Sequence, residues 1–361
     1  MVVKIGTSSL TDESGQVVDG SIAKLCAEVA AVRAEGARVV VVTSAAIAAG
    51  LPELGMGHAR PTDAVTLQAV SAVGQIRLVQ RYQHHFAEHG LVAGQVLLAP
   101  LDFSVRSQYL HARATLARLL ELGVVPVVNE NDAIADDEIR FGDNDRLAAL
   151  VAHLVDAELL VLLTDTDGVL TADPRVDSEA SLIEEIVEFD AQLESAAGGS
   201  GTPRGSGGMS SKLVAAKIAS WTGVRSVIAS ASRPDVIGAA WRGDAGVGTQ
   251  VRARDAKLSA WRLWIAFAIS SAGIVSVDAG ARAALERGGT SLLSAGVTGT
   301  SGTFGPGDAV EIADADGTVF AKGLVRVAAA NAADWAGKRS ADLPAGVAAV
   351  VVHADDLVLL P

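Results

Sequence analysis

Two acidic turns lie within seventeen residues of each other and bring side-chain carboxylates and amides together. The first turn, residues 129–132, follows the apolar run 124–128, and the second, residues 141–145, opens the helical pattern 146–154. A strand end and a helix start that both carry such groups are typical of a polar-ligand site in an α/β protein. Asn and Asp also form turns and helix caps. Two such turns in close succession, together with the lysines described next, favour a ligand site.

Two lysines stand where an anionic ligand could meet them. Lys4 lies in the first apolar run, and Gly6 and the hydroxyl residues after it would let backbone N–H groups approach a phosphate. The alternative is a lysine on an edge strand. Lys212 ends the glycine-rich segment 197–212 at the start of a helix, where a cation is unfavourable unless an anion compensates it. This segment lacks the Walker pattern, and a flexible linker is its alternative interpretation.

Two further loops follow apolar runs and have the composition of ligand-binding loops. Residues 43–50 are mostly small and join a strand to a helix, so they would allow a ligand to approach the backbone. Residues 164–168, Thr-Asp-Thr-Asp-Gly, follow the run 159–163 at the expected carboxyl edge of the sheet. A packing turn and an ordinary Asp-Gly turn are the respective alternatives.

The composition excludes several classes of protein. Of the 361 residues half are apolar, and the net charge of −13 disfavours nucleic acid or an anionic membrane as an obligatory partner. The single cysteine, Cys26, is predicted to be a buried apolar residue. Since no His/Cys cluster has metal-ligand spacing, no protein metal site is predicted. The chain opens without a signal-peptide pattern, and residues 263–277 are too short to span a bilayer, so a cytoplasmic protein is expected.

Apolar runs alternate with longer helix-period segments up to about residue 250. This alternation predicts an α/β fold in which helices cover both faces of a central, mainly parallel sheet, a three-layer sandwich. A glycine-rich stretch and a charged stretch follow, and then short β-like runs separated by Gly, Pro and Asp. We therefore predict a first domain at residues 1–252, a linker at 253–259 and a small β-rich domain at 260–361.

Taken together, the segments resemble the amino acid kinase family over nearly the whole chain. The tail is similar to a PUA domain, an appendage that indicates the glutamate-phosphorylating branch of that family. The kinase-like segments are VVKIGTSSL (2–10), VTSAAIAAG (42–50), VGQIRL (73–78), VVNENDAIA (127–135), EIRFGDNDRLAALVA (138–152), LLTDTDGVLTADPR (162–175) and GSGGMSSK (205–212). The PUA-like segments are SLLSAGV (291–297) and GPGDAVEI (305–312).

The resemblance implies ATP-dependent phosphorylation of the γ-carboxylate of L-glutamate to L-glutamyl 5-phosphate, the first step of proline biosynthesis. It implies ATP and Mg²⁺ as cofactors, with the metal held largely by ATP and water. Lys4 and Lys212 would act on the transferred phosphoryl group, and Asp145 would orient them. The residues expected to bind glutamate are Ser44, Asp132 and Asn144. Those expected to bind ATP are Lys4, Thr164, Asp165, Ser206, Gly207, Gly208, Met209, Ser210, Ser211 and Lys212.

The chemistry is compatible with these roles. A side-chain carboxylate with a reference pKa of about 4.3 is ionised at neutral pH and needs no general base. Phosphoryl transfer then depends on positioning and charge stabilisation. The resemblance further implies L-proline as feedback inhibitor, glutamyl phosphate reductase as a partner, and a homo-oligomer. Ala45 stands where the family usually has glycine, so a positive φ or a close backbone approach there would introduce strain or a methyl clash.

Two alternatives stay open. The first is a related kinase with another acceptor, such as another amino acid or carbamate. The second is a degenerate kinase whose PUA-like tail binds RNA or regulates. Residues 260–361 carry 7 basic and 10 acidic residues, a balance of −3, which argues against nucleic-acid binding.

Overall fold

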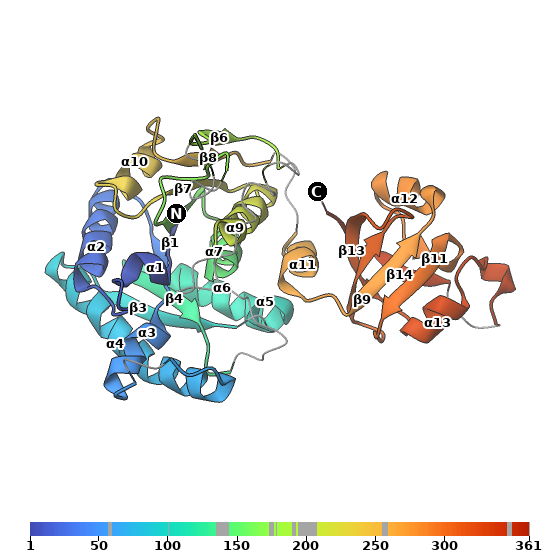
Figure 1. Cartoon of the computed structure of the whole chain (residues 1–361), viewed down its shortest axis with the longest axis horizontal. Coiled ribbons are helices and arrows are strands. Elements are labelled where there is room, and N and C mark those ends of the chain that lie inside the picture. The colour runs from blue at the N-terminus through green and yellow to red at the C-terminus, as the bar shows by residue number, and fades with distance from the viewer. Residues whose placement is uncertain are drawn as a thin grey trace. The chain divides into compact units, whose positions relative to one another are not determined.

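The computed structural model divides the chain into two compact units, Met1–Lys257 and Leu258–Pro361, and each is described by itself (Figure 1). No helix in the described part of the chain is long and apolar enough to cross a membrane. The structure describes residues 1–56, 60–99, 101–134, 144–172, 177, 179–189, 193, 208–254, 259–344 and 349–360.

The first unit is built on an eight-stranded sheet with the strand order β3-β4-β2-β1-β5-β7-β8-β6. In this order the six strands from β3 to β7 run parallel to one another. The next strand, β8, runs antiparallel to β7, and β6 at the edge pairs parallel with β8. Central strands such as β1 and β5 are buried throughout, as a parallel sheet covered on both faces requires. The strands are β1 Val2–Ile5, β2 Val40–Val42, β3 Ala93–Leu98, β4 Val125–Glu130, β5 Leu159–Thr164, β6 Glu185–Ile186, β7 Arg225–Ser230 and β8 Thr249–Val251.

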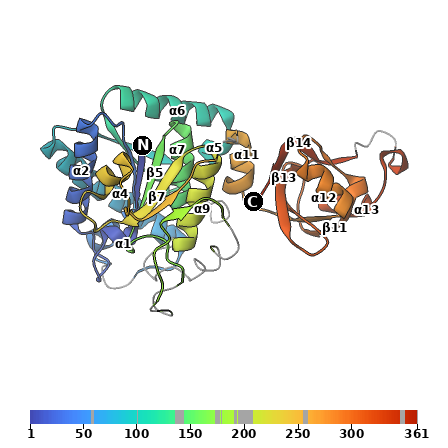
Figure 2. The ribbon, with the colours of Figure 1, turned by 90° about the horizontal axis from the view of Figure 1, so that it is seen from above.

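Helices cover both faces of this sheet (Figures 1 and 2). On one face α2, α4 and α10 share a hydrophobic cluster with the strands, and on the other α7 and α9 pack against each other and the sheet. This arrangement confirms the predicted three-layer sandwich. The helices are α1 Thr7–Leu10, α2 Asp19–Ala34, α3 Ala46–Glu53, α4 Ala64–Glu88, α5 Leu101–Ser104, α6 Arg106–Glu121, α7 Asn144–Leu154, α9 Met209–Trp221 and α10 Val236–Arg242.

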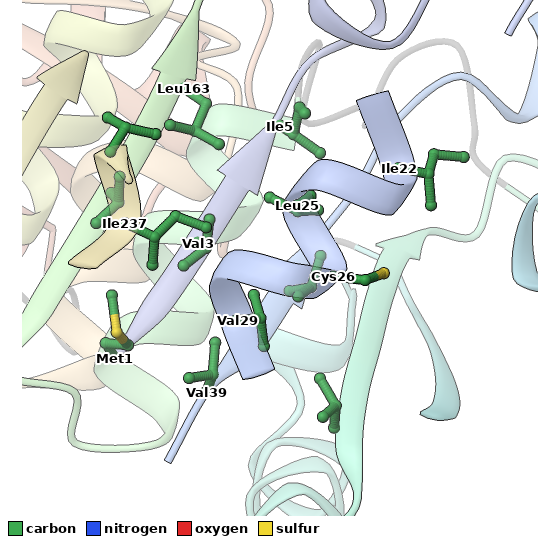
Figure 3. Close-up of a cluster of buried hydrophobic side chains, with 14 of the residues drawn as sticks. Met1, Val3, Ile5, Ile22, Leu25, Cys26, Val29, Val39, Leu163 and Ile237 are labelled. Carbon is green, nitrogen blue, oxygen red and sulfur yellow. The ribbon is translucent and has the colours of Figure 1, made fainter. Parts of the chain in front are cut away.

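The pleat of β1 determines which layer each of its side chains meets. Val3 and Ile5 enter the cluster with α2 and α10, as Figure 3 shows beside Cys26. Because successive strand residues face opposite sides, Lys4 faces the layer of α7 and α9. Cys26 is fully buried and burial raises the pKa of its thiol, which confirms its predicted apolar role. Since β1 lies between β2 and β5, Lys4 is not an edge-strand lysine.

Helices α3 and α4 approach each other through two glycines. A Cβ on Gly74 would lie 1.8 Å from the carbonyl oxygen of Ala46, and one on Gly50 would lie 2.1 Å from that of Val70. Neither position therefore has room for a side chain. This close contact holds the face of α4 that carries two buried polar residues four positions apart, Ser71 and Gln75.

The second unit has its own core and a six-stranded sheet with the order β10-β14-β13-β12-β9-β11. All pairs are antiparallel except β9 with β12. The indole of Trp261 stacks on Trp264 and donates a 3.2 Å hydrogen bond to Asp356 of the same unit. A β-rich second domain is therefore confirmed. Its elements are α11 Ala260–Leu263, the π-helix Trp264–Ala268, β9 Gly273–Val277, α12 Ala279–Glu286, β10 Leu292–Leu293, β11 Val297–Gly302, β12 Ala309–Ala313, β13 Val319–Val325, α13 Ala329–Asp334 and β14 Val350–Leu359, with 3-10 turns at Ser294–Gly296 and Ser340–Asp342.

Candidate active site

The carboxyl ends of β1, β2, β4 and β5 meet at one edge of the sheet, where the sequence predicted a ligand site. Helices α7 and α9 begin with predicted site residues and pack against each other. Two groups of side chains form there, one cationic and one of amides and hydroxyls, and Asn144 and Asp145 link them as consecutive residues of α7. Ser206 and Gly207 lie outside the described residues.

The cationic group consists of two lysines that share one carboxylate. The Nζ atom of Lys4 lies 2.7 Å from Oδ1 of Asp145, and the Nζ atom of Lys212 lies 3.2 Å from Oδ2. Exposure is 3% for Lys4, 0% for Asp145 and 5% for Lys212. The group is almost completely buried and carries one net positive charge.

Asp145 is ionised in this environment. Burial alone would raise the pKa of its carboxyl, but the charges of Lys4 and Lys212, with hydrogen bonds from Lys4 and Ser211, outweigh burial and hold that pKa below its ordinary value. The hydroxyl of Ser211 donates to Oδ2 at 2.8 Å. The carboxylate therefore holds both ammonium groups in place, and two lysines beside one carboxylate leave formal positive charge for an anion.

Local sequence places these cations. A Cβ at Gly6 would lie 3.2 Å from the Nζ atom of Lys4, so glycine leaves the ammonium room. Gly208 is the N-cap of α9, and Lys212 follows within one turn of the helix start. A helix N-terminus favours anions, which explains why a cation is tolerated there only beside one.

The second group is a chain of amides that runs from Ser44 into the protein. The Nδ2 atom of Asn144 donates to Oγ of Ser44 and to Oδ1 of Asn129, both at 2.9 Å. The Nδ2 atom of Asn129 in turn donates to Oε1 of Gln75 at 2.8 Å. The structure thus joins two predicted residues, Ser44 and Asn144, directly, and extends the chain through two that were not predicted, Asn129 and Gln75.

Asp132 connects to the same helix. Its Oδ2 atom accepts a 2.6 Å hydrogen bond from the hydroxyl of Ser71, which is buried. Ser71, Gln75 and Asn129 were not among the residues expected to bind ATP or glutamate. Asn129 had a signal, because it belongs to the first acidic turn. For Ser71 and Gln75 the sequence signal was only the spacing of two polar residues four positions apart in a helical segment.

Ala45 adopts the left-handed conformation, with φ of 78° and ψ of 16°, as the N-cap of α3. This positive φ explains the family's preference for glycine, because a left-handed residue with a Cβ is strained. The side chain is 7% exposed and belongs to the hydrophobic cluster of the unit. Ala45 is therefore a strained residue whose methyl group is buried.

Thr164 and Asp165 complete the edge beside β1. Thr164 is the last residue of β5, is buried, and its hydroxyl donates to Oδ1 of Asp165 at 3.1 Å. Its carbonyl oxygen accepts from the backbone N–H of Ala231 at 2.7 Å, which ties this loop to the end of β7. The carboxylate of Asp165 belongs to an exposed residue.

One group in the described part of the chain has metal-ligand spacing, although none was predicted from the sequence. It consists of His84, His85 and Glu88 on α4. The ring nitrogens of His85 lie 3.1 Å from Glu88 and 3.0 Å from Asp19. Burial opposes protonation of His85, but these two carboxylates raise its pKa. The imidazole is thereby committed to hydrogen bonds with Glu88 of its own helix and with Asp19, and the second of these joins α4 to α2.

Comparison with known proteins agrees with the fold. Residues 1–230 match the amino acid kinase family, and residues 273–347 match the PUA domain. The chain belongs to the amino acid kinase family. It is 44% identical to the glutamate 5-kinase of Ralstonia nicotianae over 100% of this chain and 97% of the relative. It is 45% identical to that of Mycobacterium tuberculosis (strain H37Rv) over 99% and 94%.

The fold of this family member is also found in solved structures. The chain resembles "Carbamate kinase from Giardia lamblia bound to AMP-PNP" with a TM-score of 0.50 and 16% identity, over 70% of this chain and 98% of that one. At this identity the likeness concerns the fold alone. The family match and the second sheet confirm both the predicted kinase-like domain and the PUA-like tail.

Proposed function

We propose that this protein transfers the γ-phosphoryl group of ATP to the side-chain carboxylate of L-glutamate and forms L-glutamyl 5-phosphate, the first step of proline biosynthesis. The observation that carries the proposal is the junction of two groups on α7. Asp145 holds the lysine pair, and Asn144, one residue before it, holds the amide chain to Ser44. A phosphate-binding group and an amino-acid-binding group thus share one helix start. The relatives named glutamate 5-kinase support the same acceptor.

Lys4 and Lys212 would contact the phosphates of ATP. Each ammonium is buried beside Asp145, so its attraction to a phosphate oxygen is weakly screened by water. Thr164, Asp165 and residues 206–212 would hold the rest of the nucleotide, with the start of α9 facing the phosphates. A single preorganised charge of this kind contributes about 3 kcal/mol to stabilising a transition state.

Ser44, Asp132 and Asn144 would bind glutamate. The hydroxyl of Ser44 suits its α-carboxylate, whereas the amide oxygen of Asn144 and the carboxylate of Asp132 suit its ammonium group. The γ-carboxylate is the nucleophile and is already ionised, with a reference pKa of about 4.3. The task of the protein is therefore to orient this carboxylate toward the γ-phosphorus and to neutralise charge.

Mg²⁺ would neutralise further phosphate charge when it is bound with ATP. Asp145, the buried carboxylate of the site, is already committed to two lysines. This donor set fits a metal held through the phosphates and water better than one held by a protein cage. No metal ligand is therefore assigned to the chain.

Trapping the product with hydroxylamine tests the proposal. The purified full-length protein, ATP, Mg²⁺ and L-glutamate should yield γ-glutamyl hydroxamate, whereas L-aspartate in place of L-glutamate should yield little. The variant Asp156→Asn, in an exposed ion pair with Arg113, should match the parent. Hydroxamate formed only with another acceptor would establish the related-kinase alternative, and ATP consumption with no acceptor dependence would contradict acyl transfer.

We further propose, on the family resemblance, that L-proline inhibits the enzyme, that the protein is a homo-oligomer, and that glutamyl phosphate reductase takes up the acyl phosphate. Proline inhibition should raise the apparent KM for glutamate if the two amino acids compete. Inhibition that does not depend on glutamate concentration would indicate a separate site.

A further inference from the structure

Gln75 is a buried residue of the site without an assigned role. It is 6% exposed, and its Oε1 atom accepts the hydrogen bond from Asn129. Within the described part of the chain, its Nε2 atom is buried and has no hydrogen-bond partner. An unsatisfied buried donor is unfavourable and calls for an explanation.

A backbone N–H of β4 determines that the amide oxygen of Gln75, and not its nitrogen, points at Asn129. The backbone N–H of Glu130 donates to Oδ1 of Asn129 at 3.0 Å. Because a backbone N–H can only donate, the amide oxygen of Asn129 must face it and its Nδ2 must face Gln75. Only Oε1 of Gln75 can satisfy that donor. The unsatisfied Nε2 is then the consequence of an amide orientation set elsewhere.

The same orientation extends to the substrate side. Oδ1 of Asn129 also accepts from Nδ2 of Asn144, whose other hydrogen goes to Oγ of Ser44. Ser44 therefore accepts from the protein and has its own O–H left to donate. The Oδ1 atom of Asn144 faces the N–H of Glu130 at 3.3 Å and keeps acceptor capacity. The pair presents a donor and an acceptor, which match a carboxylate and an ammonium group.

We propose that Gln75 is a positioning residue: by accepting from Nδ2 of Asn129 it stabilises the amide orientation that the backbone N–H of Glu130 sets, and through it the hydrogen-bond polarity of the glutamate-binding pair Ser44 and Asn144. This inference rests on the proposed function. Gln75 acts through Asn129 and does not touch the substrate. The contact of α4 with α3 at Gly74, one residue away, keeps it in register. Together with the N–H of Glu130, Gln75 thereby keeps Ser44 a donor and Asn144 an acceptor before glutamate arrives, which lowers the cost of binding.

Gln75→Met tests the proposal, because methionine matches the length of glutamine and cannot accept the hydrogen bond. The expected result is a KM for glutamate at least tenfold higher, with kcat and the KM for ATP within twofold of the parent. The melting temperature should stay close to that of the parent, since one unsatisfied donor, Nε2 of Gln75, is exchanged for another, Nδ2 of Asn129. Gln83→Met, on the exposed face of the same helix, should change none of these quantities.

A second variant tests whether Gln75 acts through Asn129. In Asn129→Ala the relay is already broken, so adding Gln75→Met should change the dissociation constant for glutamate, measured by calorimetry, by less than twofold. The inference is overturned if the KM for glutamate is unchanged in Gln75→Met, or if ATP affinity and melting temperature fall together with glutamate affinity. It is also overturned if the effects of the two substitutions on the dissociation constant for glutamate add in the double variant. A parent protein that makes no hydroxamate would overturn the proposed function instead.

Discussion

Asp145→Asn separates the structural and the electrostatic roles of the buried carboxylate. The substitution keeps the shape of the side chain but leaves two ammonium groups, 3% and 5% exposed, without their counter-charge at 2.7 and 3.2 Å. Removing one partner of a buried ion pair costs about 3–5 kcal/mol. In a domain of this size about 1 kcal/mol corresponds to roughly 2–4 °C, so the melting temperature should fall by about 6–20 °C.

ATP should reverse part of this loss. In the variant the phosphates become the compensating anion for Lys4 and Lys212, and binding to the folded state alone raises the free energy of unfolding. Mg-ATP is therefore expected to raise the melting temperature of Asp145→Asn more than that of the parent, although kcat falls. Because the folded-state pKa of Asp145 is lowered, its contribution is present above the unfolded value of about 3.8 and disappears as pH falls through the folded value.

Thermal melts at neutral pH, with and without Mg-ATP, provide the measurement. Asp156→Asn is the matched control, because Asp156 forms a 2.6 Å ion pair with Arg113 in which the side chains are 73% and 49% exposed, respectively. Its positive φ of 48° also suits asparagine. The control should lie within about 0.5 kcal/mol of the parent. Two outcomes would show that the lysines do not depend on Asp145 for their counter-charge. One is a melting temperature of Asp145→Asn equal to that of the control, and the other is equal stabilisation of parent and variant by Mg-ATP.

Three further predictions concern single residues. Lys212→Ala should lower kcat by about two orders of magnitude with a smaller effect on the KM for glutamate, and Asp132→Ala should mainly raise that KM; identical kinetic patterns would contradict the proposed roles. Ala45→Gly should stay within about 1 kcal/mol of the parent in urea denaturation. Relief of about 1–2 kcal/mol of strain is offset by a more flexible unfolded chain and a lost buried methyl. Since the folded pKa of His85 is raised, its contribution is complete below the unfolded value of 6.5 and is lost as pH rises through the folded value. The urea midpoint should therefore fall with pH over that range in the parent and less in His85→Gln.

Local patterns predicted much of the fold. The run 159–163 within β5 is continuously apolar, which indicates a strand covered on both faces, and the alternation with helical segments indicates a parallel sheet. The same kind of signal identified Cys26 as buried and the acidic turns as candidate site residues. One departure from a family motif left a positive φ or a close backbone approach open at Ala45, and the backbone has the positive φ. Each of these inferences depends on neighbours in sequence.

The contacts between distant segments could not be read in this way. The sequence alone left open whether Lys4 belongs to an edge strand or a central one, and the strand order settles this because β1 lies between β2 and β5. Gln75 lies 54 residues from Asn129, and Ser71 lies 61 residues from Asp132. Hydrophobic periodicity shows which face of α4 is buried but not which polar groups it meets. The amino-acid sequence determined the layers and the residue types at the sheet edge. Only the tertiary structure decided how closely Lys4 and Lys212 share Asp145 and which amide chain orients Asn144, because burial makes each polar group depend on a partner that the fold, and not the local sequence, supplies.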